Sequence, residues 1–208
     1  AGVLALTEQL ARQRLSADAE ACVASIAEAA AGVARLVDTA IDLTGVSQRG
    51  PTLHLEPVRL RELMDDIQAQ WQPRAAEAGV TLLVSYDGDP DAAAMADRQR
   101  LLQIFDGFIG EAVAAQARGA VEAGLHAHSG PDGVRLEGRV RGPRDTSWDE
   151  QDADSRIRII DERLGLEIAL GALLARRILT GMNGVLRKEA NAGASDTATF
   201  EIHLAPIP

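Results

Sequence analysis

A helical stretch in the middle of the chain carries residue types that are suited to cation chemistry. Over residues 104–113 large apolar side chains recur at helical spacing, and between them stand two carboxylates, Asp106 and Glu111, and two glycines, Gly107 and Gly110. Glycines are unusual inside a helix because they lower its stability. A carboxylate at such a place could coordinate a hard cation such as Mg²⁺. Glu111 is therefore a candidate metal ligand.

Two further residue types could bind metal or form a crosslink. His126 and His128 are two residues apart in an alternating, strand-like segment, so they share one face and could supply two ligands to a metal. Solvated strand histidines are the simpler interpretation. The only cysteine, Cys22, can form no internal disulfide, which indicates a reducing, cytoplasmic setting.

Length and charge narrow the class of protein. The 208 residues suffice for one substantial domain, or for a small helical module joined to a larger domain. The 31 acidic residues outnumber the 21 Lys and Arg, and the net charge of −10 argues against a nucleic-acid partner. The longest apolar runs fall far short of the roughly 20 residues that cross a bilayer. The first residues already have helical periodicity, so the chain is expected to be a fragment of a longer protein.

Two helices are predicted at the start of the chain. Val3, Leu6 and Leu10 recur at spacings of three and four, which indicates one helix. Ser16 is a suitable N-cap for a second helix that should run to about Val46 with a heptad-like apolar stripe. A two-helix hairpin cannot bury such a stripe alone. A homodimeric four-helix bundle is therefore expected.

The remaining sequence alternates helix and strand patterns, and the fold class is predicted as α+β. The helical hairpin is assigned to residues 1–48 and a sandwich, with helices on one face of a sheet, to residues 52–208. Asp97 should cap the central helix. The expected elements are a strand 52–56 ended by Pro57, a helix 60–78, a strand 80–86, a hairpin within 121–140, a loop 142–160, a helix 164–179 and strands 185–188 and 198–204.

Several patches in this order resemble the core of bacterial sensor histidine kinases. They are RLVDTAIDL at 35–43, LHLEPVRLREL at 53–63, ADRQRLLQI at 96–104, RLGL at 163–166 and DTATFEIHL at 196–204. The resemblance implies a dimerising hairpin that carries a phosphorylated histidine and a catalytic ATP-binding sandwich of the Bergerat type. It places the phospho-accepting residue upstream of Ala1.

The resemblance also implies three nucleotide-binding motifs, and the first two are altered. Where the family has a magnesium-coordinating asparagine this chain has Glu111, and Gly107 stands at another position that is commonly asparagine. The Asp-x-Gly-x-Gly loop is matched by residues 140–144, in which Val140 replaces the aspartate that accepts a hydrogen bond from adenine. Gly142 is retained, and Arg144 stands at the second glycine.

The third motif, a glycine-rich turn that receives phosphate at a helix N-terminus, is altered as well. Gly165 is retained, but Asp161 and Arg163 replace the preceding glycines. Because all three motifs depart from the family pattern, ATP and Mg²⁺ are not expected as cofactors. The alternative is an active kinase in which Glu111 binds Mg²⁺ and Arg144 or Arg163 binds phosphate.

The leading hypothesis is a two-component signalling protein whose degenerate nucleotide site leaves a regulatory dimer. Its expected partners are a second copy, a response-regulator receiver domain and, in some settings, another histidine kinase. Val3, Leu6 and Leu10 are candidate docking residues, although packing inside the bundle core is the simpler explanation for them. Within this hypothesis, the chain resembles α-proteobacterial cell-cycle regulators in which tyrosine replaces the histidine. A further alternative is a histidine phosphotransferase that passes phosphate without ATP.

Overall fold

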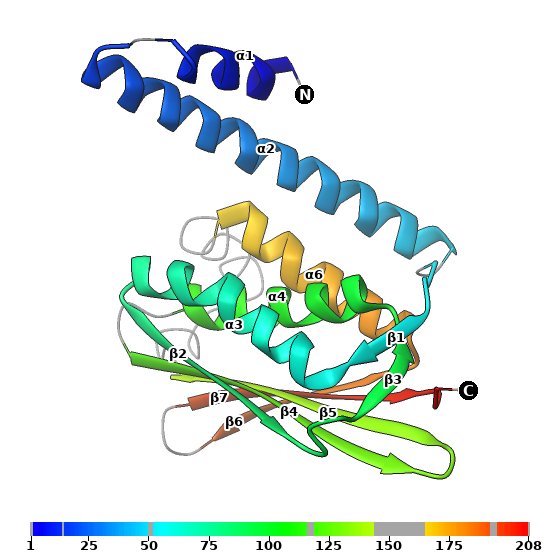
Figure 1. Cartoon of the computed structure of the whole chain (residues 1–208). Helices are drawn as coiled ribbons and strands as arrows, with labels where there is room; N and C mark the ends of the chain where they lie inside the picture. Colours follow the sequence, from blue (N-terminus) through cyan, green and yellow to red (C-terminus); the bar gives the residue numbers. More distant parts are fainter. Residues whose placement is uncertain are drawn as a thin grey trace, which may run out of the picture.

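A helical hairpin opens the computed structural model, which describes residues 2–13, 15–49, 52–115, 119–143, 165–191 and 195–207. Its helices are α1 (Gly2–Ala11) and α2 (Ala17–Arg49) (Figure 1). The predicted N-cap is confirmed, since Ser16 Oγ accepts the backbone N–H of Ala19 at 3.4 Å. Helix α2 extends three residues beyond its predicted end, because a single interior glycine, Gly45, costs only about 1 kcal/mol and does not end a helix.

Over the described residues, three helices and seven strands form an α/β sandwich after the hairpin. The helices are α3 (Leu60–Glu77), α4 (Arg98–Ala114) and α6 (Gly165–Gly181). The strands are β1 (Glu56–Arg59), β2 (Val80–Asp87), β3 (Ala93–Ala96), β4 (Gly119–Gly130), β5 (Gly133–Pro143), β6 (Val185–Asn191) and β7 (Ser195–Leu204). The predicted α+β class and the order of hairpin followed by sandwich are therefore observed.

The larger sheet has five strands in the order β2-β4-β5-β7-β6. Strands β2 and β4 are parallel and are joined through β3 and α4, whereas the other neighbouring pairs are antiparallel. Strands β1 and β3 form a separate two-stranded sheet, which meets the end of β7 through a bridge between Met95 and Ala205. Strand β3 was not predicted.

Helices α3, α4 and α6 cover one face of the five-stranded sheet (Figure 1). Strand β4 alternates as predicted, with Val121, Ala123 and Leu125 buried under these helices. The predicted inner face of α3 is also confirmed, because all five of its members are buried: Leu60, Leu63, Met64, Ile67 and Trp71. At the centre, Phe105 and Phe108 of α4 pack against Phe200 of β7 at ring-centroid distances of 5.1 and 5.7 Å. One contiguous core thus fixes α4 on the sheet.

The predicted first strand of the sandwich is wrong in position. The structure has β1 at Glu56–Arg59, so Pro57 lies inside the strand and His54 lies before it. Pro57 is tolerated because β1 pairs only with β3, and an edge strand needs no N–H on its open side. The predicted loop 142–160 is also corrected at its start, because Gly142 and Pro143 belong to β5. The rest of that loop lies outside the described residues.

Helix α2 lies across the helical layer of the sandwich, on the side away from the sheet (Figure 1). It packs mainly against α6. Leu43, on the inner side of α2, is a partly buried member of the sandwich core. The hairpin is therefore in direct contact with the sandwich through the second half of α2.

Candidate functional site

Helix α4 is the element around which the candidate residues gather, and its start is firmly fixed. Asp97 is buried and caps the helix as predicted, accepting the backbone N–H of Arg100 at 3.0 Å. Its second carboxylate oxygen accepts the backbone N–H of His54 at 2.9 Å. One side chain thus ties the segment before β1 to the start of α4 and sets the rotation of the helix about its axis.

Gly107, one of the predicted nucleotide-site residues, contacts α6 directly. A Cβ atom built on Gly107 would lie 2.5 Å from the carbonyl oxygen of Gly171 and 2.6 Å from the Cβ of Ala175. Both distances are too short for a real side chain. Glycine is required here because it lets the backbones of α4 and α6 cross closely, so an asparagine has no space in this arrangement.

Glu111 lies one turn further along α4 and is paired with two cations. Its Oε1 accepts a hydrogen bond from Lys188 Nζ at 2.7 Å and from Arg176 Nη2 at 3.3 Å. The side chain of Glu111 remains 31% exposed. Lys188 comes from β6 and Arg176 from α6, and neither was singled out in the sequence. The carboxylate therefore links three elements, and a cation at Glu111 would have to displace or adjoin two positive charges.

The other candidate nucleotide residues lie on β5 and at the start of α6. Val140 is buried in the sheet between Ala123 of β4 and Ala198 of β7, and Gly142 is buried opposite Asp196. A valine side chain has no atom that accepts a hydrogen bond. Gly165 is the first residue of α6. Arg144 and Arg163, proposed as phosphate ligands in the active-kinase alternative, lie outside the described residues.

The candidate docking residues of α1 are exposed. Val3, Leu6 and Leu10 have exposed fractions of 55%, 61% and 41%. Helix α2 carries a second apolar stripe with about half of each side chain exposed, made up of Ile26, Val33, Val37 and Ile41. Among these stripe residues, Ile41 also lines the cavity between α2 and the sandwich that is described below.

A polar contact that the sequence did not reveal joins the two units. Asp42 of α2 accepts hydrogen bonds from Arg100 Nη1 at 2.9 Å and from Gln103 Nε2 at 3.0 Å, both on α4. Arg100 Nη1 also donates to Gln103 Oε1 at 2.8 Å. The side chain of Arg100 is only 16% exposed, so this ion pair is better shielded than the usual surface pair. It fixes the position of α2 over α4.

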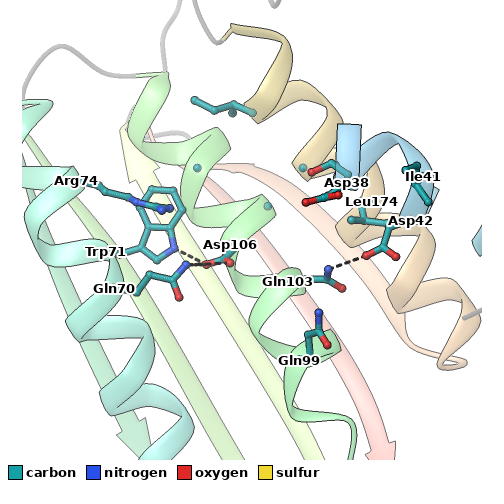
Figure 2. A pocket seen from close by; sticks show the side chains of 15 residues that line it. Asp38, Ile41, Asp42, Gln70, Trp71, Arg74, Gln99, Gln103, Asp106 and Leu174 are labelled. Carbon is teal, nitrogen blue, oxygen red and sulfur yellow. Dashed lines mark hydrogen bonds between the residues drawn. The ribbon is translucent and has the colours of Figure 1, made fainter. Parts of the chain in front are cut away.

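Beside this contact, a cavity of about 550 Å³ lies between α2 and the helices α3, α4 and α6. Asp106 of α4 faces it and accepts hydrogen bonds from Trp71 Nε1 at 2.6 Å and from Gln70 Nε2 at 3.2 Å (Figure 2). Burial raises the pKa of Asp106, and the hydrogen bonds from Trp71 and Gln70 and the charge of Arg74 oppose the rise. A titratable group thus lines the boundary between the two units.

The two histidines of β4 lie together on the strand, as their spacing predicts. Their rings are 4.0 Å apart between centroids, and His126 Nδ1 lies 2.7 Å from Asp87 Oδ2. Within the described part of the chain, no group of three His, Cys, Asp or Glu side chains has the geometry of a metal site. His126 therefore has a hydrogen-bond partner on the neighbouring strand, which agrees with the simpler interpretation of these histidines.

Comparison with known proteins gives matches among solved structures. No protein-family model matches the chain, and no curated protein does. The structure of full-length ShkA in complex with AMPPNP matches at 25% identity and a TM-score of 0.72, over 99% of this chain and 43% of ShkA. This chain thus spans less than half of ShkA.

Two more histidine kinases match at lower identity. AdeS of Acinetobacter baumannii is 15% identical with a TM-score of 0.59, over 98% of this chain and 94% of AdeS. A histidine kinase from Burkholderia phymatum STM815 is 20% identical with a TM-score of 0.54, over 97% of this chain and 85% of that kinase. None of the described helices has the length and apolarity needed to cross a membrane. Because these alignments cover nearly all of this chain, hairpin and sandwich together, the chain has the fold of a histidine kinase core.

Proposed function

We propose that this chain is the core of a two-component signalling protein whose nucleotide site is degenerate and which acts as a regulatory dimer. The observation that carries the proposal is the pairing of Glu111 with Lys188 and Arg176 at 2.7 and 3.3 Å. Mg²⁺ at this carboxylate would stand beside two positive charges. Since Mg²⁺ also demands several oxygen ligands in near-octahedral geometry, the described residues do not fit a magnesium–nucleotide complex.

The neighbouring positions support the same conclusion. Gly107 leaves no space for an asparagine side chain, and the buried side chain of Val140 cannot accept a hydrogen bond from the adenine amine. An unmatched donor of this kind costs about 1 to 3 kcal/mol of binding free energy. Each change acts at a different part of the nucleotide, so restoring one residue would leave the others unmatched.

Isothermal titration with AMPPNP and Mg²⁺ tests the degenerate site, with the ShkA core as the positive control because ShkA forms a complex with AMPPNP. We expect no saturable heat for this chain up to about 1 mM ligand. A Glu111→Asn variant should behave identically, because Val140 is unchanged. Low-micromolar affinity that is abolished by Glu111→Ala would overturn the proposal.

That result would support the second candidate function, an active ATP-dependent kinase with divergent motifs. The match to ShkA, at 25% identity, is the observation in its favour. In that case Glu111 would exchange Lys188 for Mg²⁺ when nucleotide binds, and Lys188→Met would raise the affinity for the magnesium complex. In the degenerate site, Lys188→Met leaves binding undetectable.

The proposed partners are a second copy of the chain and a response-regulator receiver domain. The exposed stripe of α2 supports the first, because burying it against its symmetry mate would form a four-helix bundle. The exposed residues Val3, Leu6 and Leu10 of α1 support the second. Titration with an isolated receiver domain from the same organism tests the docking. We expect Leu6→Asp to weaken binding, and equal affinity for Leu6→Asp and for the exposed control Glu8→Gln would exclude α1 as the docking surface.

A further inference from the structure

The cavity between the hairpin and the sandwich has the size and position of a small-molecule site. Its volume of about 550 Å³ lies within the range of roughly 300 to 1,000 Å³ that is usual for ligand pockets. Boundaries between structural units are a preferred place for such pockets. Glu111 does not line this cavity, whereas Gly107, one turn before it on α4, does.

Polar groups from both units point into this space. Figure 2 shows Asp38 and Asp42 extending from α2 towards α4, and Asp106 on the α4 side next to Trp71. Asp42 and Asp106 are held by the hydrogen bonds described above. Asp38 is exposed, and the described side chains give it no hydrogen bond or ion pair. Its carboxylate is thus the one best placed to meet a ligand.

The charge of the walls decides which class of ligand the cavity suits. The charge of Asp42 is compensated by Arg100. The other two carboxylates, Asp38 and Asp106, face one lining cation, Arg74, whose guanidinium lies over the Trp71 ring at 5.3 Å. An anion would therefore be repelled, and a cation would be attracted. A bare metal ion lacks a coordinating group of three suitable side chains here, judged over the described residues.

The apolar part of the lining favours a ligand with a hydrocarbon body. Ile41 of α2 and Ile168 and Leu174 of α6 contribute aliphatic surface between the carboxylates. The amides of Gln99 and Gln103 add hydrogen-bond acceptors that an ammonium or guanidinium group can use. Acidic walls with aliphatic surface between them suit a ligand that has a hydrocarbon body and a cationic group at its end.

We propose that this cavity binds a small organic cation, an alkylamine or alkylguanidine, with its charged group at Asp38 and its aliphatic part against Ile41 and Leu174. Because the walls come from α2 on one side and from α3, α4 and α6 on the other, the bound cation stabilises the contact between hairpin and sandwich. Such a ligand would add chemical sensing to a signalling core. The inference does not depend on whether the nucleotide site is active.

Fluorescence of Trp71 provides a direct test in the full chain. The chain has two tryptophans, and replacing Trp148 by Phe leaves Trp71 at the cavity wall as the reporter. The probe is agmatine, which carries a guanidinium and an amine on a four-carbon chain, and the control ligand is L-glutamate. We expect a saturable change in Trp71 emission with agmatine at constant ionic strength, and none with L-glutamate.

Variants of single carboxylates locate the site. Asp38→Asn is expected to weaken agmatine binding by about fivefold, the size of one partly exposed ion pair. The matched control is Asp132→Asn, which removes the same charge from the exposed turn between β4 and β5 and should leave the affinity unchanged. Circular dichroism establishes that both variants are folded. A change in emission that fails to saturate, an equal response to L-glutamate, or equal affinities for the two variants would each overturn the proposal.

Discussion

In the sandwich the largest apolar side chains are almost completely buried, whereas in the hairpin the apolar stripe of α2 is about half exposed. Phe105 and Phe200 each retain 1% exposure, but Val33 and Ile41 retain 60% and 62%. The sandwich therefore completes its own core, since a sheet and three helices can enclose one apolar layer. Two helices cannot do so, and the hairpin needs a partner to bury its stripe.

Removing a large side chain from the sandwich core should have the largest effect. Phe105→Ala leaves a cavity beneath α4 and is expected to lower the free energy of unfolding by about 3 to 5 kcal/mol. Urea unfolding followed by circular dichroism measures the loss. Val33→Ala, on the exposed stripe, is the control and should change the stability of the sandwich by less than about 0.5 kcal/mol. A similar loss in both variants would contradict the contrast between the two regions.

A charge on the hairpin stripe should act on assembly instead of folding. Val33→Asp is expected to weaken self-association about 100-fold, because the carboxylate would be buried without a partner in a four-helix bundle. Sedimentation velocity over a range of concentrations measures the change. Ser25→Asp introduces the same charge at an exposed polar position of α2 and should leave the association constant nearly unchanged. A wild-type chain that is monomeric at micromolar concentration would remove the basis for the bundle.

Gly107→Asn should destabilise the sandwich by about 1 to 3 kcal/mol, because overpacking forces α4 and α6 apart. The nearest obstacle is the carbonyl oxygen of Gly171, which is backbone and cannot rotate away. Gly45→Ala is the matched control in the hairpin, since a Cβ there meets nothing within 4 Å. We expect that control to be neutral or to stabilise α2 by up to about 1 kcal/mol. Thermal unfolding of both variants compares the loss of stability at the close crossing of α4 and α6 with that on the exposed face of α2.

The smallest effect is expected at Asp106, on the boundary between the two regions. Burial raises its pKa above the ordinary value of 3.8, so the folded chain holds this proton more tightly than the unfolded chain does. Ionisation of Asp106 therefore lowers the free energy of unfolding as the pH rises from about 4 through the raised pKa. Asp106→Asn removes this loss, and the variant should gain stability relative to the wild type between about pH 4 and pH 7.

Urea unfolding at about pH 4 and at about pH 7 measures the free energy of unfolding of Asp106→Asn, and of the exposed control Asp132→Asn, relative to the wild type. The control should show the same difference from the wild type at the two pH values. A pH-independent difference for Asp106→Asn would show that burial of this carboxylate has no effect on stability.

Regular elements were predictable wherever one local pattern dominated. The heptad-like stripe, the inner face of α3 and the alternation of β4 depend only on which residues are apolar and how they are spaced. Strands β1 and β3 were misplaced or missed, because each has four residues and their pairing depends on a partner about 40 residues away. A strand of four residues is too short for its apolar alternation to identify it.

The sequence named the candidate site residues but did not predict their contacts. The sequence located Glu111, Gly107 and Val140 through their order along the chain, and it gave no indication that Glu111 would meet Arg176 and Lys188. These partners lie 65 and 77 residues further along the chain. The pairing of Asp42 with Arg100 spans 58 residues and was hidden for the same reason.

The sequence alone determined the order of hairpin and sandwich, the cap at Asp97 and the residue types at positions 111 and 140. Local hydrogen bonds and apolar periodicity are enough for these, because they involve neighbours along the chain. Only the tertiary structure decided that Gly107 lies against the backbone of α6, that Glu111 is paired with two cations and that a cavity opens between α2 and α4. Such contacts arise when separate helices and strands pack together, and no local pattern specifies the distance between them.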